Sequence, residues 1–207
     1  MYELEATADV LLMTGQGKSL QGLPVIDQQA IGVAPEAGAS REARLVQAVL
    51  AGDRDMYGSL YQLYAPLVHG ILLARLPRSE VEDMVQEIFL HALTKLHTLR
   101  DAEAFGPWIG MIARNRAMDF HRRSRETVEV TDDLEGGDSS GSKAAEILEI
   151  ILSLPDTYRE TLVLRLVEGM TGPEIATRTG LTSASVRVNL HRGMKLLRAK
   201  LGFREGV

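Results

Sequence analysis

Two stretches of this chain concentrate cations in a way that suits the binding of nucleic acid. The range Arg187–Lys200 holds five cations and no acidic residue, which on a helix would form a surface that attracts phosphates. The range Arg114–Arg125 holds five arginines against one acid, Asp119. Phe105 and Trp108 precede the second stretch, and aromatic rings beside arginines are typical of sites for single-stranded nucleic acid. Taken alone, Trp108 is more typical of a core residue.

A third set of polar residues is acidic. Asp83 and Glu87 share one face of a predicted helix with Glu82 beside them, and His91 lies one turn further on. Such residues could form half of a metal site, but no matching second motif occurs elsewhere. Acidic residues near a helix N-terminus are also favoured by the helix dipole. We therefore expect no metal here, and a solvated face or a docking surface for another protein.

The cations of Arg187–Lys200 follow a segment that reads as a helix-turn-helix. Gly180 lies where the chain must turn with a positive φ, and Val186 lies where the next helix returns to the core. Thr182 or Ser183 can cap that helix, since a short hydroxyl side chain satisfies its free N–H groups. These offsets predict a helix-turn-helix that reads duplex DNA.

The arginines of the second stretch end the last of four predicted helices in the first half of the chain. Apolar periodicity places these helices at about 41–51, 56–76, 79–96 and 104–123. Pro66 lies inside the second helix and should kink or divide it. Ser79 followed by Glu82 predicts a capping box at the start of the third.

The remaining segments divide the chain into parts. Residues 126–142 contain six acids and no cation and are rich in Gly and Ser, which predicts a flexible linker. Residues 1–40 lack a sustained period, and we expect them to be mostly disordered. The prediction is an all-α protein of two small helical domains, 41–125 and 143–207, joined by a flexible acidic linker.

Composition excludes several classes of protein. The chain has 207 residues, a net charge of −5 and no cysteine, which excludes disulfides and thiolate metal sites. The acids gather in 1–40 and 126–142, so the predicted domains are mildly basic despite the net charge. No apolar run is long enough to cross a membrane, and acids precede the short apolar run Val10–Met13, so we expect no signal peptide and a cytoplasmic protein.

Four motifs in order resemble those of bacterial RNA polymerase sigma factors of the sigma-70 family, extracytoplasmic-function (ECF) group. They are EDMVQEIFLHALTKL (Glu82–Leu96), AFGPWIGMIARNRAMDFHRR (Ala104–Arg123), LPDTYRETLVLRLVEGMTGPEIA (Leu154–Ala176) and SVRVNLHRG (Ser185–Gly193). The resemblance implies a region 2-like domain at 41–125, a region 4-like domain at 143–207, and a protein that is not an enzyme and needs no cofactor. Its implied partners are core RNA polymerase, promoter DNA and an anti-sigma factor.

The resemblance also implies three sets of site residues. Those facing core polymerase would be Asp83, Gln86 and Glu87. Those on the melted −10 strand would be Trp108, Arg114, Asn115, Arg116, Asp119, Arg122 and Arg123. Those on the −35 duplex would be Thr182, Ser183, Ser185, Arg187, Asn189, His191, Arg192 and Lys195.

Three other functions stay open from the residues alone. A helix-turn-helix regulator would bind duplex DNA without polymerase. A metal-dependent helical enzyme would use Glu82, Asp83, Glu87 and His91. A sigma-like adaptor would bind polymerase without opening promoters.

Overall fold

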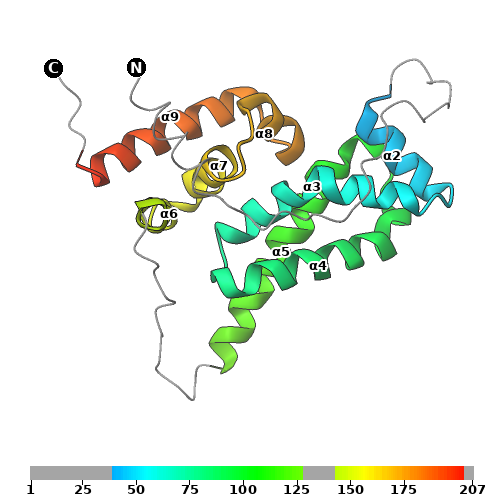
Figure 1. The fold of residues 1–207 in the computed structure, drawn as a ribbon, viewed down its shortest axis with the longest axis horizontal. Helices are drawn as coiled ribbons and strands as arrows, with labels where there is room; N and C mark the ends of the chain where they lie inside the picture. Colours follow the sequence, from blue (N-terminus) through cyan, green and yellow to red (C-terminus); the bar gives the residue numbers. More distant parts are fainter. Residues whose placement is uncertain (1–38, 128–142, 203–207) are drawn as a thin grey trace.

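The computed structural model describes residues 39–127 and 143–202, and every regular element in these two ranges is a helix. The all-α prediction is confirmed for this part of the chain (Figure 1). The first group of helices comprises α2 (Arg41–Leu50), α3 (Asp55–Leu73), α4 (Arg78–Lys95), the 3-10 turns η1 (Leu96–Thr98) and η2 (Ala102–Ala104), and α5 (Phe105–Thr127). The second comprises α6 (Lys143–Leu152), α7 (Asp156–Leu166), α8 (Gly172–Thr179) and α9 (Ser183–Lys200).

The predicted segments at the edges of these groups fall largely outside the described residues. Of the expected N-terminal extension, 1–40, only the last two residues are described. Helix α5 continues through Thr127, two residues into the range predicted as linker, and the remainder of that range, 128–142, lies outside the described residues.

Local sequence signals set most helix ends, but the signal predicted for the start of α4 is wrong. Gly52 follows α2 with a φ of +104°, as a glycine at a helix C-terminus allows. The capping box predicted at Ser79 is wrong, because α4 begins at Arg78 with Pro77 as its N-cap and no side-chain cap. Pro77 has φ −55° and ψ 142°, which places Ser79 already inside the first turn.

Helix α3 is not divided at Pro66, which lies within its 19 residues. A proline there removes one backbone hydrogen bond. Burial on both sides of this position holds the helix together, since Tyr64, Leu67 and Val68 are at most 4% exposed. Tertiary packing thus outweighs the local preference.

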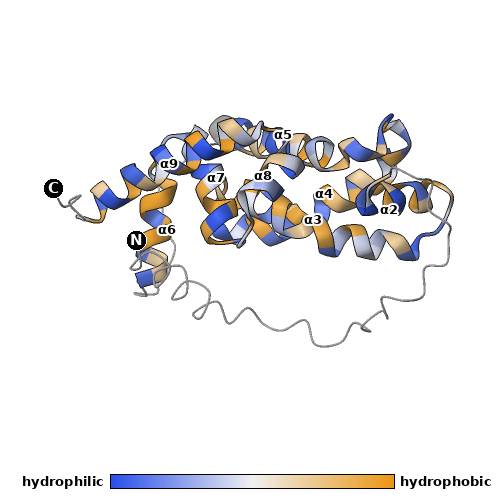
Figure 2. Ribbon diagram, turned by 90° about the horizontal axis from the view of Figure 1, so that it is seen from above, coloured by the Kyte–Doolittle hydropathy of each residue, from blue (hydrophilic) through white to orange (hydrophobic). Residues whose placement is uncertain are grey.

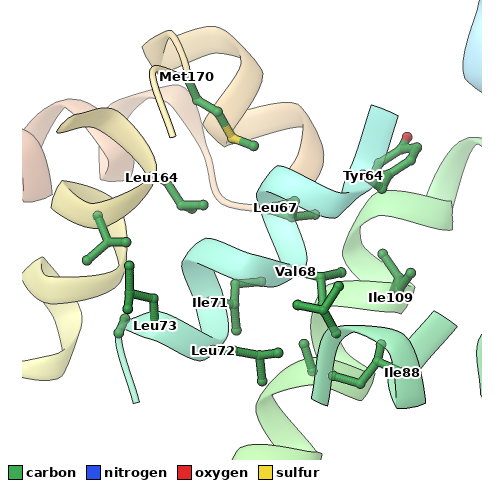
Figure 3. Close-up of a cluster of buried hydrophobic side chains, with 14 of the residues drawn as sticks. Tyr64, Leu67, Val68, Ile71, Leu72, Leu73, Ile88, Ile109, Leu164 and Met170 are labelled. Carbon is green, nitrogen blue, oxygen red and sulfur yellow. The ribbon is translucent and has the colours of Figure 1, made fainter. Parts of the chain in front are cut away.

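Helix α3 is the central element of the core. Its residues Val68, Ile71 and Leu72 are fully buried. Figure 3 shows Ile88 of α4 and Ile109 of α5 on one side of α3, and Leu164 and Met170 of the second group on the other. The two groups therefore share one continuous hydrophobic core, in which α7 packs on α3 and α8 packs on α5.

Candidate nucleic-acid and polymerase interface

The turn of the helix-turn-helix has the predicted geometry. Gly180 closes α8 with a φ of +76°, so its left-handed conformation is confirmed. Of the two proposed caps, Thr182 is the one used, and its hydroxyl oxygen accepts from the Ser185 N–H at 3.1 Å. Val186 is 1% exposed and joins the core as predicted. These contacts fix the direction in which α9 leaves the turn.

The start of α8 carries a cap that the sequence reading missed. Thr171 and Glu174 form a capping box: the Glu174 N–H donates to the threonine hydroxyl, and the Thr171 N–H donates to the Glu174 carboxylate at 2.8 Å. The Glu174 carboxylate accepts from the Thr171 N–H and, at 2.7 Å, from the Thr171 hydroxyl, and these two hydrogen bonds hold the pKa of the Glu174 carboxyl below its usual range. The signal was present as T-x-x-E just before an apolar position.

Helix α9 presents one side to α7 and the other to solvent. Val186, Gly193 and Leu197 form the buried side, and a Cβ at Gly193 would lie 3.0–3.1 Å from atoms of Leu162 and Tyr158. Figure 2 shows hydrophilic and hydrophobic residues alternating along this helix. The solvent side holds most of the residues predicted to meet the −35 duplex. Exposed among them are Thr182, Ser183, Ser185, Arg187, His191, Arg192 and Lys195, while Asn189 is half-buried.

Helix α5 changes character along its length. Phe105, Ile109, Ala113 and Ala117 recur at four-residue spacing and are fully buried, so they bind the helix to the core. Trp108 is half-buried, packs on that core and lies 5.8 Å from Phe105 between ring centroids. Part of its side chain thus serves the core and part stays accessible.

The polar residues of α5 lie in three different settings. Asn115, Arg122 and Arg123 are exposed, and Arg122 pairs with Asp119 at 3.2 Å within the same helix. Arg116 is 27% exposed and lies 3.3 Å from Glu87 of α4. Arg114 is directed toward the second group of helices instead of solvent.

Arg114 belongs to an ion cluster around Glu160 of α7. Arg114 donates to both carboxylate oxygens of Glu160, at 2.6 and 3.1 Å, and Arg75, which lies just after α3, donates to one of them at 2.6 Å. The Glu160 side chain is 11% exposed. Burial alone would raise the pKa of the Glu160 carboxyl, but the hydrogen bonds and charges of Arg114 and Arg75 together outweigh it and hold that pKa below its usual range.

Helix α4 offers an exposed polar face with an apolar residue in it. Asp83, Gln86 and Glu87 are all exposed, as a docking surface requires. Leu90, which the sequence reading did not single out, is 67% exposed and follows Gln86 by one helical turn. The signal was available, because Leu90 does not belong to the buried stripe of this helix: Val81, Val85, Ile88, Phe89 and Ala92.

The predicted polymerase face and the predicted −10 face are adjacent. The Glu87–Arg116 ion pair joins α4 to α5 between them. A small depression beside this pair is lined by Met84, Glu87, Arg116, Phe120 and Arg123. The structure therefore brings these two sets together, whereas the α9 set lies on the second group.

Within 39–127 and 143–202, no group of three or more His, Asp or Glu residues is placed to hold a metal ion. Glu82 lies 3.7 Å from His69 of α3, a residue outside the set of Glu82, Asp83, Glu87 and His91. Among the helices described, none is long and apolar enough to cross a membrane.

Two family models match the chain: Sigma-70 region 2 over residues 60–127, and Sigma-70, region 4 over residues 144–197. The chain is similar to the RNA polymerase sigma factor CarQ of Myxococcus xanthus, with 32% identity over 161 residues that cover 73% of this chain and 92% of CarQ. It is also similar to the ECF RNA polymerase sigma factor SigM of Bacillus subtilis, with 29% identity over 150 residues that cover 68% of this chain and 91% of SigM.

Two solved structures share the fold. One is CnrH in complex with the cytosolic domain of CnrY, with a TM-score of 0.55, 24% identity, and coverage of 79% of this chain and 99% of CnrH. The other is the sigma factor RpoE of Bartonella quintana in complex with the anti-sigma factor NepR, with a TM-score of 0.52, 16% identity, and coverage of 72% and 98%.

A helix-turn-helix whose second helix is basic and exposed, preceded by another basic helix beside the exposed polar face of α4, is an arrangement that suits a DNA-binding transcription protein. With the two family models and these relatives, the chain belongs to the sigma-70 family of RNA polymerase sigma factors, in its ECF group.

Proposed function

We propose that this protein binds core RNA polymerase, recognises the −10 and −35 elements of a promoter and promotes strand opening at the start of transcription. The observation that carries this function is that two basic helix surfaces, on α5 and α9, belong to two different helical groups. The α5 surface has an aromatic side chain for stacking, and α9 is the second helix of the helix-turn-helix. Unpaired and duplex DNA are therefore bound by different parts of one chain.

Core polymerase docks on the exposed face of α4. Asp83, Gln86 and Glu87 supply carboxylates and an amide, and Leu90 supplies an exposed apolar side chain among them. An apolar residue surrounded by polar groups is the usual composition of an interface centre. The polymerase carries out the chemistry of RNA synthesis, and this chain supplies no catalytic group.

The melted strand of the −10 element lies along α5. Arg116, Arg122 and Arg123 supply cations for phosphates, and the accessible part of Trp108 supplies a surface on which a base can stack. Stacking on an aromatic side chain contributes about 1–3 kcal/mol per base. This energy is gained only with unpaired bases, so binding favours the open strand over the duplex.

The −35 element is read by α9 in the major groove, which is about 12 Å wide and accepts a helix. Ser183, Ser185 and Arg187 lie in its first turns, next to the Thr182 cap, and the cations Arg192 and Lys195 follow on the exposed side. In a helix-turn-helix the N-terminal residues of the recognition helix meet base edges. The later cations then position the helix on phosphates.

Each surface alone holds only a handful of cations, so salt weakens its binding strongly. Once both groups are held on one polymerase, the second contact forms at a high effective concentration. A factor whose two DNA contacts are each weak is therefore specific for a promoter only when it is assembled with polymerase. We place this activity in the cytoplasm, where bacterial polymerase meets the chromosome.

An anti-sigma factor is the expected inhibitor. The Bartonella quintana RpoE, which shares this fold, was solved with the anti-sigma factor NepR. Because this chain has no cysteine, any thiol-based sensing would belong to that partner.

A helix-turn-helix regulator that acts without polymerase is the alternative. It would account for α9 but not for the exposed α4 face with Leu90, nor for the arginines beside Trp108. These features favour a polymerase-bound factor.

The test is run-off transcription from a promoter library with core polymerase, with and without this protein. We expect transcripts that depend on the protein, and fewer of them with Arg116→Ala or Arg187→Ala, since each change removes one exposed or partly exposed cation. Duplex binding that is equally tight without core polymerase, together with no dependent transcript, would favour the regulator.

A further inference from the structure

The side of α9 opposite the core carries a row of residues that begins with two apolar side chains. Val186, Gly193 and Leu197 mark the buried side of the helix. A helix turns by about 100° per residue, so the residues directly opposite follow one another at spacings of four, three and four positions. This outer row is exposed along its whole length and consists of Ala184, Val188, His191 and Lys195.

Val188 contributes little to the fold. Its side chain is 43% exposed and is not one of those packed against the hydrophobic core of the described residues. Valine is also a weaker helix former than alanine or lysine, because its branched side chain loses freedom against the preceding turn. Neither packing nor helix propensity therefore accounts for a valine here, and its methyl groups are available to a partner.

The cations around the outer row indicate what that partner is. Arg187 and Arg192 are both exposed and lie on opposite sides of the row, each about 70° around the helix from it. Phosphates line both edges of the major groove, so two cations that bind the two backbones direct the row between them toward the base edges. Since Thr182 caps α9, Ala184 and Val188 lie in its first two turns, the part of a recognition helix that meets bases.

The chemistry of the two apolar side chains selects one base. Only thymine presents a methyl group in the major groove, at C5, and small apolar side chains make contact with it. The other bases present donors and acceptors there, which a valine would desolvate without giving them a hydrogen bond. Ala184 and Val188 are about 6 Å apart along the helix axis, which spans about two base-pair steps.

We propose that Val188, with Ala184 beside it, determines part of the −35 specificity by contact with the C5-methyl group of a thymine in the major groove. The proposal rests on the proposed function, because it names the base chemistry that the same α9 surface recognises. It predicts at least one A·T pair in the −35 element, with its methyl group under the first two turns of α9.

Replacement of single thymines by deoxyuridine tests this contact. Deoxyuridine pairs with adenine as thymine does and lacks only the C5-methyl group. Promoter duplexes are first selected from a random library by the complex of this protein with core polymerase. Each thymine of the −35 element, on either strand, is then replaced in turn, and the affinity of the complex for each duplex is measured. We expect deoxyuridine at one or two positions to weaken binding about fourfold, the factor that follows from burial of one methyl group.

Two variants assign the effect to Val188. Val188→Ala removes the methyl groups that reach the base, so the affinity ratio between thymine and deoxyuridine should fall below twofold at one of the sensitive positions. Leu196→Ala is the matched control: Leu196 is also an exposed apolar residue of α9, 39% exposed, but lies outside the outer row and near the other end of the helix. This variant should keep the full ratio.

Three results would overturn the proposal. They are a −35 element without an A·T pair, equal affinity for thymine and deoxyuridine at every position, and a ratio that Val188→Ala leaves unchanged. The last result would show that the methyl group acts through the shape of the DNA. Transcription from the selected promoters is measured separately. A thymine preference that depends on Val188, together with no transcript, would support this contact and defeat the proposed function, whereas transcription without such a preference would do the reverse.

Discussion

Replacing Gly180 by alanine tests the turn that sets the direction of α9. Gly180 has a φ of +76°, and for an L-residue the left-handed region costs about 1–2 kcal/mol. The new Cβ would also lie 3.3 Å from two Pro107 atoms, so Pro107 must shift by a few tenths of an ångström. We expect Gly180→Ala to lower the free energy of unfolding by about 1–2 kcal/mol.

Gly172→Ala is the matched control. Gly172 is the first residue of α8, no positive φ is required there, and a Cβ would meet nothing within 4 Å. The alanine restricts the unfolded chain, so this variant should be more stable than the unaltered protein by about 0.4–1 kcal/mol. The two alanines, eight positions apart, should thus act in opposite directions.

Urea unfolding followed by circular dichroism measures both changes. With an m-value of about 2 kcal/mol/M, Gly180→Ala should lower the midpoint by about 0.5–1 M, while Gly172→Ala raises it slightly. The affinity of Gly180→Ala for −35 duplex in the polymerase complex should fall as well, because α9 is aimed differently. If both variants unfolded at the midpoint of the unaltered protein, the strain argument for this turn would be refuted.

Three further predictions follow from single contacts. Hydrogen bonding to Glu168 raises the pKa of the His69 imidazole above its ordinary 6.5, so its stabilising effect is complete below pH 6.5 and is lost as the pH rises through the raised pKa. The loss in unfolding free energy caused by His69→Gln should therefore be larger at pH 6 than at pH 9, and an equal loss at both would argue against a charged pair. Leu90→Ser should weaken binding to core polymerase at least fivefold in a fluorescence titration. It should leave the melting temperature unchanged, because this side chain is 67% exposed. A fall in melting temperature would show that Leu90 is structural. Thr171→Val removes the hydroxyl of the capping box of α8. It should lower the free energy of unfolding by about 1 kcal/mol in urea unfolding. An unchanged free energy of unfolding would mean that the box contributes nothing.

The sequence predicted well those features that depend on neighbouring residues. Helix ends at Gly52 and Gly180 follow from φ values that glycine alone adopts easily, and the Thr182 cap follows from a hydroxyl three residues before an N–H. The buried stripes of α4 and α5 follow from helical periodicity. Even the error at Ser79 is local, because Pro77 is the N-cap and the cap of α4 therefore lies two residues earlier than predicted.

The contacts between the two groups of helices were not predictable in the same way. Glu160 meets Arg75 and Arg114 across separations of 85 and 46 residues, and no spacing rule connects them. Glu160 reads as one more charged residue of an amphipathic helix until tertiary packing buries it. The Arg178 contact with the Leu63 carbonyl spans 115 residues and depends on how α8 is seated on α5. These contacts decide which of the predicted DNA-binding arginines are accessible.

The candidate sites were predicted as sets, and the structure shows how the sets are arranged. The predicted −35 residues are exposed except for the half-buried Asn189, and the α4 and α5 sets meet at the Glu87–Arg116 pair. Their roles on polymerase and DNA stay predictions.

Permanganate reactivity of unpaired thymines in a promoter tests the central claim most directly, since it reports strand opening itself. With core polymerase and this protein together, thymines of the −10 non-template strand should become reactive, and Trp108→Ala should reduce that reactivity. Neither core polymerase alone nor the protein alone should open the duplex. A −10 element that stays unreactive with both components present, on a promoter they jointly bind, would contradict the account.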